Sequence, residues 1–290
     1  MRFSSYLGLI LASCAAPLAA QEAAAPPVDA VERQGPPQAT VFDGDWLTVG
    51  VGVGLGPSYD GSDDYVFSPA PLVQGSLGGI GISPKPAGLA LDFIPDGESG
   101  PNFSLGPSLR LRNDRADQIK DEVVKLAGEL DRAVELGVAG GVSFPAVLNP
   151  FDSLSFNLDT RWDVANAHDG MVIEPGVSYF TPLSGGMAAS LSIGAEFVDD
   201  NYADYYYSVS PAQSLASGLP EFSAKGGLNS IGTNLLLAVD LDGDVTNGGF
   251  AVVLIGGYSR LMNDAKATPY TSIRGSADQF FGALGVGYTF

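Results

Sequence analysis

Along most of this chain, apolar side chains alternate with small or polar ones at a period of two residues. The stretch 47–55 reads Leu-Thr-Val-Gly-Val-Gly-Val-Gly-Leu, and similar alternation recurs in 103–112, 134–144, 154–163 and 187–197. Side chains on a β-strand point alternately to opposite faces, whereas a helix repeats every 3.6 residues. The pattern therefore predicts a chain built mainly of β-strands with one apolar face.

The polar face of these strands indicates what the apolar face contacts. In a soluble sandwich the polar face is solvated and rich in lysine, glutamate and threonine. Here it is mostly glycine, serine and asparagine, and the 290 residues include 14 lysines and arginines. Small polar residues toward a lumen and apolar ones toward lipid, in segments of about ten residues, are typical of outer-membrane barrels. We predict an all-β fold, a transmembrane antiparallel up-and-down β-barrel, with a soluble sandwich as the alternative.

Twelve segments of this kind can be counted, which predicts about twelve strands. They span residues 45–56, 66–74, 78–83, 88–94, 102–112, 132–144, 153–163, 171–180, 187–198, 228–240, 249–260 and 280–290. The longest gaps are 113–131, 199–227 and 261–279, and they follow odd-numbered segments. Long extracellular loops and short periplasmic turns produce this bias if the amino terminus is periplasmic. Apolar residues in the gap 113–131 also predict a short amphipathic helix.

Charge and rare residue types exclude several functions. The formal net charge is −19, whereas nucleic-acid binding requires lysine and arginine stripes, so no nucleic-acid partner is predicted. One cysteine and one histidine rule out a disulfide framework, a thiolate zinc site and a multi-histidine cluster. Beyond residue 20, no stretch has the roughly 18 continuous apolar residues of a spanning helix. Any membrane residence is therefore predicted to be through strands.

The amino terminus has the features of an export signal. Residues 1–20 contain a charged start, an apolar run and a small-residue cleavage site after Ala20, which predicts a signal peptide. The run Leu-Ala-Ser before Cys14 also resembles a lipidation signal, so Cys14 is either lipidated or removed with the peptide. Residues 21–44, rich in alanine and proline, predict a flexible periplasmic leader. The barrel domain is expected over 45–290.

The final segment carries an assembly pattern. Leu284, Val286, Tyr288 and Phe290 share one parity. A terminal phenylalanine with alternating apolar residues upstream resembles the carboxy-terminal signal that the barrel-assembly machinery reads. We therefore expect that machinery as a partner, together with outer-membrane lipid and lipopolysaccharide.

Few residues suggest catalysis or metal binding. His168 beside Asp169 could form a proton-relay pair, but a triad also needs a nucleophile and an orienting partner, and a loop-turn role is favoured. The run 240–244, Asp-Leu-Asp-Gly-Asp, resembles the start of a calcium loop. However, Val245 replaces the required glycine and Ala251 the bidentate glutamate, so a solvated hairpin turn is favoured. No catalytic, cofactor-binding or metal-binding residues are predicted, and no cofactor.

Other polar residues are predicted to act through their position in the barrel. Acidic residues in two outer loops could bind divalent cations that bridge lipopolysaccharide, or could be solvated surface: Asp60, Asp63, Asp64, Asp199, Asp200 and Asp204. Tyrosines in the second of these loops predict part of an interfacial girdle or a folded outer loop rather than a sugar platform: Tyr202, Tyr205, Tyr206 and Tyr207. Strand parity predicts lumen-facing arginines opposite acidic residues: Arg110, Arg112 and Arg161 opposite Glu135, Asp159 and Asp163. Such charges could plug a narrow barrel by pairing, or set selectivity in an open one.

Three blocks resemble the MipA/OmpV family, named for an MltA-interacting protein and an outer-membrane protein V. The first comprises 49–54, 57–65 and 69–71, the second 205–210 and 216–220, and the third 260–265, 268–269 and 287–290. Glu135-Leu136-Gly137 fits a further family segment. The resemblance spans about residues 45–290. The sequence departs from the family pattern at Asn263, at Thr268 and in the segment 168–170.

The resemblance implies an outer-membrane barrel without established catalytic residues. It also implies a scaffold that links a lytic transglycosylase to a penicillin-binding murein synthase in peptidoglycan remodelling. We therefore expect a non-enzymatic structural role in the cell outer membrane of a Gram-negative organism. The alternative is a narrow porin-like channel for small solutes. A barrel hydrolase is a third hypothesis, which fails if replacing His168 leaves any detected activity unchanged.

Overall fold

The structure is a computed structural model that describes residues 40–97 and 100–290. The predicted signal peptide, Cys14 and residues 21–39 of the predicted leader lie outside the described residues. The remaining leader residues contain a short 3-10 helix, η1 (Val41–Asp43). The Val41 N–H donates to the Thr246 carbonyl at 2.8 Å, so this segment is held against the turn that follows residue 240.

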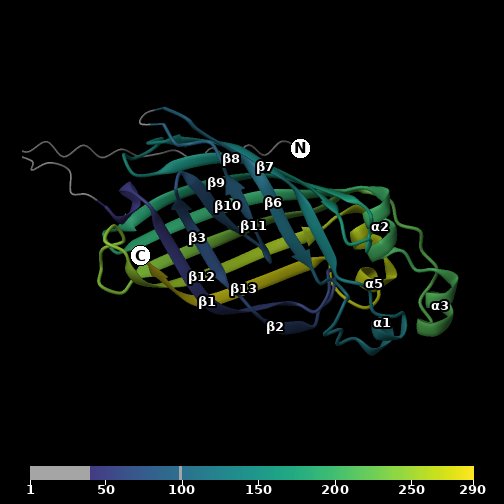
Figure 1. The fold of residues 1–290 in the computed structure, drawn as a ribbon. Coiled ribbons are helices and arrows are strands. Elements are labelled where there is room, and N and C mark those ends of the chain that lie inside the picture. Colours follow the sequence, from purple (N-terminus) through teal and green to yellow (C-terminus); the bar gives the residue numbers. More distant parts are fainter. Residues whose placement is uncertain (1–39, 98–99) are drawn as a thin grey trace, which may run out of the picture. The chain divides into compact units, whose positions relative to one another are not determined.

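Strands make up most of the described chain (Figure 1). They are β1 (Trp46–Pro57), β2 (Tyr65–Pro69), β3 (Leu72–Leu77), β4 (Ile80–Lys85), β5 (Gly88–Asp92), β6 (Asn102–Arg112), β7 (Ala133–Pro145), β8 (Ser153–Asp163), β9 (Met171–Ser184), β10 (Met187–Val198), β11 (Gly227–Asp240), β12 (Gly249–Leu261) and β13 (Asp278–Thr289). All strand pairs are antiparallel.

The sheet closes into a barrel because β13 pairs with β1. β2 and β3 both pair with β1, at 53–57 and 46–50 respectively, so they are two halves of one wall strand. The break between them falls at Ala70-Pro71, where proline lacks the N–H that a continuous ladder needs. The wall therefore has twelve strands, as predicted, although the segment predicted at 66–74 is divided and extends to Leu77.

The apolar parity of the strands faces outward. On β1, Val51 is 74% exposed, and on β13 Leu284 and Val286 are 53% and 44% exposed. On the opposite parity β1 carries Gly50, Gly52, Gly54 and Gly56. An outward apolar band with small residues inside is the arrangement of a membrane-spanning barrel, and it confirms the barrel over the soluble sandwich.

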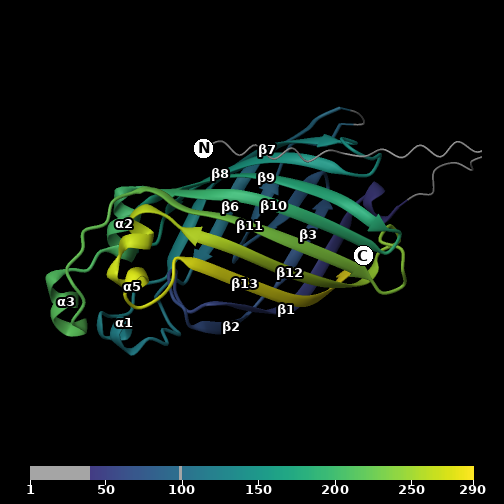
Figure 2. The ribbon, with the colours of Figure 1, turned by 180° about the vertical axis from the view of Figure 1, so that it is seen from behind.

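One end of the barrel carries all helices of the described residues other than η1, and the other end carries short turns (Figures 1 and 2). The helices are α1 (Glu122–Leu126), α2 (Asp200–Tyr207), α3 (Pro211–Ser217), α4 (Asn263–Ala267) and α5 (Pro269–Ser272). They lie in the three long gaps that the sequence indicated, and α1 is the predicted short helix. We call these the helical end and the turn end. No helix in 40–97 or 100–290 is long and apolar enough to cross a membrane.

Candidate functional site

A group of paired charges occupies the lumen near the helical end. We call it the lumen network; its members are Lys85, Arg110, Arg112, Arg161, Asp60, Glu135, Asp159, Glu174 and Glu196. The sequence predicted that the three arginines face the lumen opposite Glu135, Asp159 and Asp163. Arg112 and Arg161 pair with Glu135, and Arg161 pairs with Asp159, whereas Arg110 pairs with Glu174 and Glu196. Strand register brings Arg112 and Arg161 near Glu135, because β7 lies between β6 and β8 and each arginine is two residues from the register partner of Glu135.

Glu135 is the centre of the lumen network. Its side chain is fully buried, and its Oε1 lies 2.7 Å from Arg112 Nε. Its Oε2 lies 3.1 Å from Arg161 Nε. A buried carboxylate is costly unless it is paired and hydrogen-bonded, and here each oxygen accepts from an arginine. One side chain thus connects residues from β6, β7 and β8.

Two further glutamates extend the lumen network across the barrel. Glu174 on β9 pairs with Arg110 and with Arg161, both at 2.6 Å. Glu196 on β10 lies 3.0 Å from Arg112 Nη2, and Asn229 on β11 donates to it at 2.6 Å. The paired groups therefore run from β6 to β11. Side chains paired in this way occupy part of the barrel interior near the helical end.

Asp163 does not join the lumen network, contrary to the prediction. It lies at the end of β8, and its Oδ2 accepts from the backbone N–H groups of Ala167, His168 and Asp169 at 2.6, 2.9 and 3.1 Å. The turn after β8 needs an acceptor for these N–H groups, and Asp163 supplies it. Side-chain parity alone could not distinguish a lumen ion pair from a turn cap.

His168 lies in the turn between β8 and β9, but its side chain is more deeply buried than is usual for a turn residue. Its side chain is buried, with Nε2 3.4 Å from Glu135 Oε1, and Nδ1 accepts from the Gly170 N–H at 3.0 Å. An accepting Nδ1 places the ring proton on Nε2, toward Glu135. No hydrogen bond or ion pair joins the His168 and Asp169 side chains in the described residues, so the proton-relay pair, which the sequence did not favour, is not formed. His168 borders the lumen network.

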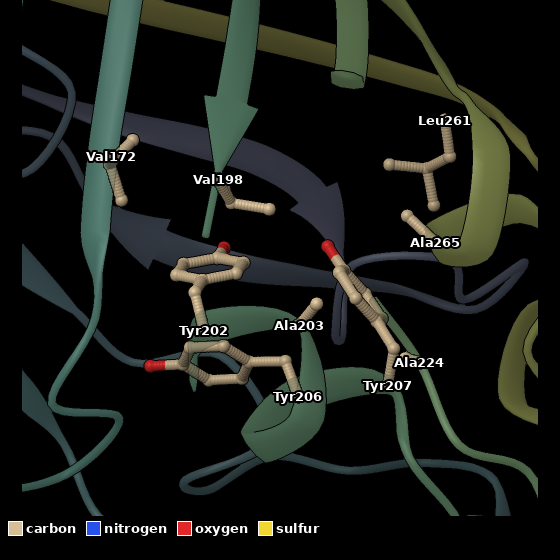
Figure 3. Close-up of a cluster of buried hydrophobic side chains, with 9 residues drawn as sticks. All are labelled: Val172, Val198, Tyr202, Ala203, Tyr206, Tyr207, Ala224, Leu261 and Ala265. Atoms are coloured by element: carbon tan, nitrogen blue, oxygen red, sulfur yellow. The ribbon is translucent and has the colours of Figure 1, made fainter. Parts of the chain in front are cut away.

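A layer of buried tyrosines lies at the helical end beside the lumen network, and Figure 3 shows its side chains. Tyr202, Tyr206 and Tyr207 on α2 are at most 2% exposed and pack with Val172 and Leu261 from the strand ends. The Arg112 guanidinium lies 4.9 Å from the centre of the Tyr202 ring, a cation–π contact. Burial raises the pKa of Tyr206 far above its usual range. The tyrosines thus belong to a folded loop at the helical end and not to an interfacial girdle.

The other outer loops pack beside the tyrosine layer. Arg115 lies over the ring of Tyr270 at 3.9 Å and donates to the Tyr206 carbonyl at 3.0 Å. Asp121 caps α1 and pairs with Arg274 at 2.7 Å. Burial alone would raise the pKa of Asp121, but the bonds from Arg274 and from backbone N–H groups hold it below the usual range. The three long loops therefore form one packed cover.

The predicted acidic cation-bridging residues have local partners. Asp60 lies 3.8 Å from Arg112, on the lumen side of its loop. Asp199 caps α2 by accepting from the Tyr202 N–H at 3.0 Å, and Asp204 accepts from Ser208 at 2.7 Å. In the calcium-like turn, Asp240 Oδ1 accepts from three backbone N–H groups. These carboxylates stabilise backbone turns and the lumen network.

A cavity of about 450 Å³ adjoins the lumen network, and polar residues such as Asn157, Ser178, Ser192 and Asn234 line it. Sequence reasoning missed four members of the network, namely Lys85, Asp60, Glu174 and Glu196. Strand parity could have indicated Glu196, which lies on the polar parity of β10. Lys85 and Asp60 lie at a strand end and in a loop, where parity gives no direction.

A closed antiparallel barrel of twelve strands, with an outward apolar band and paired charges in its lumen, is a β-barrel of the outer-membrane type. The family model of the MltA-interacting protein MipA matches residues 49–290. The chain therefore belongs to the MipA family.

The chain is similar to the COG4313 outer membrane channel from Pseudomonas putida F1, with 14% identity, a TM-score of 0.43, and coverage of 88% of this chain and 99% of that chain. It is also similar to OprD from Pseudomonas aeruginosa, with 14% identity, a TM-score of 0.36, and coverage of 86% and 66%. For OccAB1 from Acinetobacter baumannii, identity is 10%, the TM-score 0.29, and coverage 87% and 98%. No curated protein matches the chain.

Proposed function

We propose that this protein resides in the cell outer membrane with its helical end extracellular and its turn end periplasmic. The outward apolar band, the family and the long loops at one end support this orientation. In this proposal residues 1–20 are the signal peptide, 21–44 a periplasmic leader and 45–290 the barrel. Lipid, lipopolysaccharide and the barrel-assembly machinery are then its general partners.

We further propose a non-enzymatic scaffold role in peptidoglycan remodelling, linking a lytic transglycosylase with a penicillin-binding murein synthase. The supporting observation is the lumen network, in which Glu135 and Arg161 are at most 1% exposed and paired. A barrel plugged by paired charges under a tyrosine layer is poorly suited to free diffusion, which leaves its periplasmic surface for function. The family description, an MltA-interacting protein, agrees with such a partner.

Crosslinking in intact cells tests the scaffold. The barrel is purified in detergent after crosslinking, and co-purifying proteins are identified by mass spectrometry. We expect a lytic transglycosylase and a murein synthase, both absent from an unrelated barrel treated in parallel. Recovery of assembly factors and lipopolysaccharide alone would contradict the scaffold role.

A narrow channel for small solutes is the second candidate. The cavity of about 450 Å³ with polar lining favours it, because a modest shift of the plug would give solutes a wet path. Planar-bilayer recordings separate the two candidates. Conductance in the unmodified protein that disappears on charge reversal of Arg110 supports the channel, and a silent protein that recruits murein enzymes supports the scaffold.

A further inference from the structure

The barrel wall has a seam where neighbouring strands are not hydrogen-bonded. β3 pairs with β4 at three positions, the last toward the helical end being Gly75 with Ile82. Between Gly75 and Tyr65, the wall strand made of β2 and β3 pairs with β1 along one edge. Within the described residues, its other edge pairs with no strand over this stretch. On the far side of the seam, β4 ends at Lys85 and turns into β5. β2 and β3 are visible beside β1 in Figure 1.

The free edge of β2 is poorly suited to accept another strand. The Ala70 N–H donates to Gly52 on β1 at 3.0 Å, and strand alternation therefore turns the polar groups of Tyr65, Phe67 and Pro69 toward the seam. Pro69 has no N–H, and the Tyr65 carbonyl already accepts from Lys120 Nζ. This edge therefore lacks the regular series of free N–H and C=O groups that another β-strand needs for pairing, because proline on an edge prevents pairing.

The cavity beside the lumen network borders the β4–β5 side of the seam. Lys85 and Pro86, at the tip of the β4–β5 hairpin, line it. The Lys85 side chain is 23% exposed and lies 3.5 Å from Asp159, whose same oxygen is 2.7 Å from Arg161. Since Asp159 is already closely paired with Arg161, Lys85 is the cation of the lumen network that an incoming anion can most easily engage.

Part of the cavity lining is apolar. Phe281 on β13 lines the cavity, and its ring lies over Gly257 on the neighbouring strand β12. Although it faces the lumen, 41% of Phe281 is exposed, and the lumen face of the adjoining β1 consists largely of glycine. The cavity therefore has both an exposed aromatic ring and an accessible cation in a lining that also includes polar side chains.

We propose that the seam is a lateral opening from the lipid phase into this cavity, and that the cavity binds an amphipathic molecule with an anionic head group. The head group engages Lys85, and the apolar chain lies toward Phe281 and the glycine face of β1. A cavity of about 450 Å³ lies within the usual range for small-molecule sites, roughly 300–1,000 Å³. This site is separate from any murein partner, since it needs only the folded barrel.

Photolabelling of the full chain in lipid nanodiscs tests the site. The probe is a dodecanoate that carries a diazirine near the end of its chain, and labelled residues are mapped by mass spectrometry. We expect label on Phe281 or its lumen neighbours, competed by unlabelled dodecanoate but not by dodecyltrimethylammonium. Lys85→Gln should lower lumen labelling about fivefold, the effect of losing one modest charge contact. Lys125→Gln, on exposed α1, is the matched control and should label normally.

Three outcomes would overturn the proposal: label confined to outward residues such as Leu284, equal competition by the cationic amphiphile, or unchanged labelling of Lys85→Gln. Gel heat-modifiability checks that the variant is folded. If it is not, Phe281→Ala takes its place and should lose lumen labelling. Mass spectrometry of lipids extracted from the purified protein distinguishes the source, because a bound anionic phospholipid indicates a membrane lipid and its absence indicates a free fatty-acid-like solute.

Discussion

Arg112 and Glu135 form a buried ion pair at the centre of the lumen, with Arg112 Nε 2.7 Å from Glu135 Oε1. Their side chains are 5% and 0% exposed. Because Glu135 also accepts from Arg161, its removal would take one carboxylate partner from each of two arginines in a site with little access to water. The contact therefore matters both for stability and for whether the lumen is closed.

Glu135→Gln should destabilise the barrel by about 1–3 kcal/mol, because the amide replaces one accepting oxygen and leaves a buried donor unsatisfied. Arg112 keeps Glu196, and Arg161 keeps Asp159 and Glu174. Urea unfolding in lipid vesicles, followed by tryptophan fluorescence, measures the change. Asp278→Asn is the control, because the Arg260–Asp278 pair is 47% and 43% exposed and such pairs contribute about 0–1 kcal/mol. Equal effects of the two substitutions would contradict the central role of Glu135.

Tyr206→Phe should leave the cover of the lumen intact, whereas Tyr206→Ala should loosen it. The Tyr206 Oη is buried with no hydrogen-bond partner in the described part of the chain, so removing the hydroxyl loses little. Removing the ring leaves a large cavity, which typically costs about 3–5 kcal/mol. The rate of proteolysis within 199–227 measures the effect. Similar rates for both variants would indicate that the ring does not hold this loop.

Asp60→Asn should make the protein more stable than wild type, and this difference should grow as the pH rises from about 4 to 6. Burial and then the neighbouring Asp114 carboxylate raise the pKa of Asp60 to about 6, from about 3.9 in an unfolded chain. The folded state therefore holds this proton more tightly, and stability is lost between about pH 4 and pH 6 as the group ionises. The neutral asparagine does not suffer this loss.

The urea midpoints of Asp60→Asn and wild type, compared from pH 4 to pH 8, measure this difference. The gain should be small, since 37% of the Asp60 side chain is exposed and solvent screens it. The neighbouring exposed residue Asp63, changed to asparagine, is the control. A difference between Asp60→Asn and wild type that does not change with pH would refute the assignment.

Val51→Arg should destabilise the barrel by about 2–4 kcal/mol, because a cation on the lipid face near mid-membrane is costly. Val51 lies near the middle of β1 and is 74% exposed. Asn234→Arg places the same side chain at the polar cavity and should cost much less. Refolding yield into vesicles and urea midpoints compare the two, and an equal cost would show that Val51 does not face lipid.

Much of the fold could be predicted because a strand with lipid on one side and a lumen on the other imposes strict alternation. Val51 and the glycines beside it carry that signal directly. Alternation also placed Arg110, Arg112 and Arg161 in the lumen. Where the chain leaves the strands, side-chain direction depends on the turn. The predicted position of Asp163 in the lumen was therefore wrong, and the burial of His168 beside Glu135 was not anticipated.

The division of one wall strand into β2 and β3 was also missed. Pro69 and Pro71 were visible in the sequence, but their effect depends on which neighbour they face, and that follows from strand register. The deep burial of the α2 tyrosines likewise depends on contacts between loops far apart in sequence. Both features arise from tertiary structure, which a local pattern does not contain.

The pairing of β1 with β13 has a consequence for the order of assembly. Thr48 pairs with Thr289 and Leu55 with Gly282, so the first strand finds its second neighbour only after every intervening strand has been made. Until then two long edges stay open, and a barrel of this kind has no stable half-built form in lipid. Contacts between such distant residues are slow to form. Insertion must therefore wait for the last strand, and any substitution there should affect the rate of biogenesis before it affects the finished molecule.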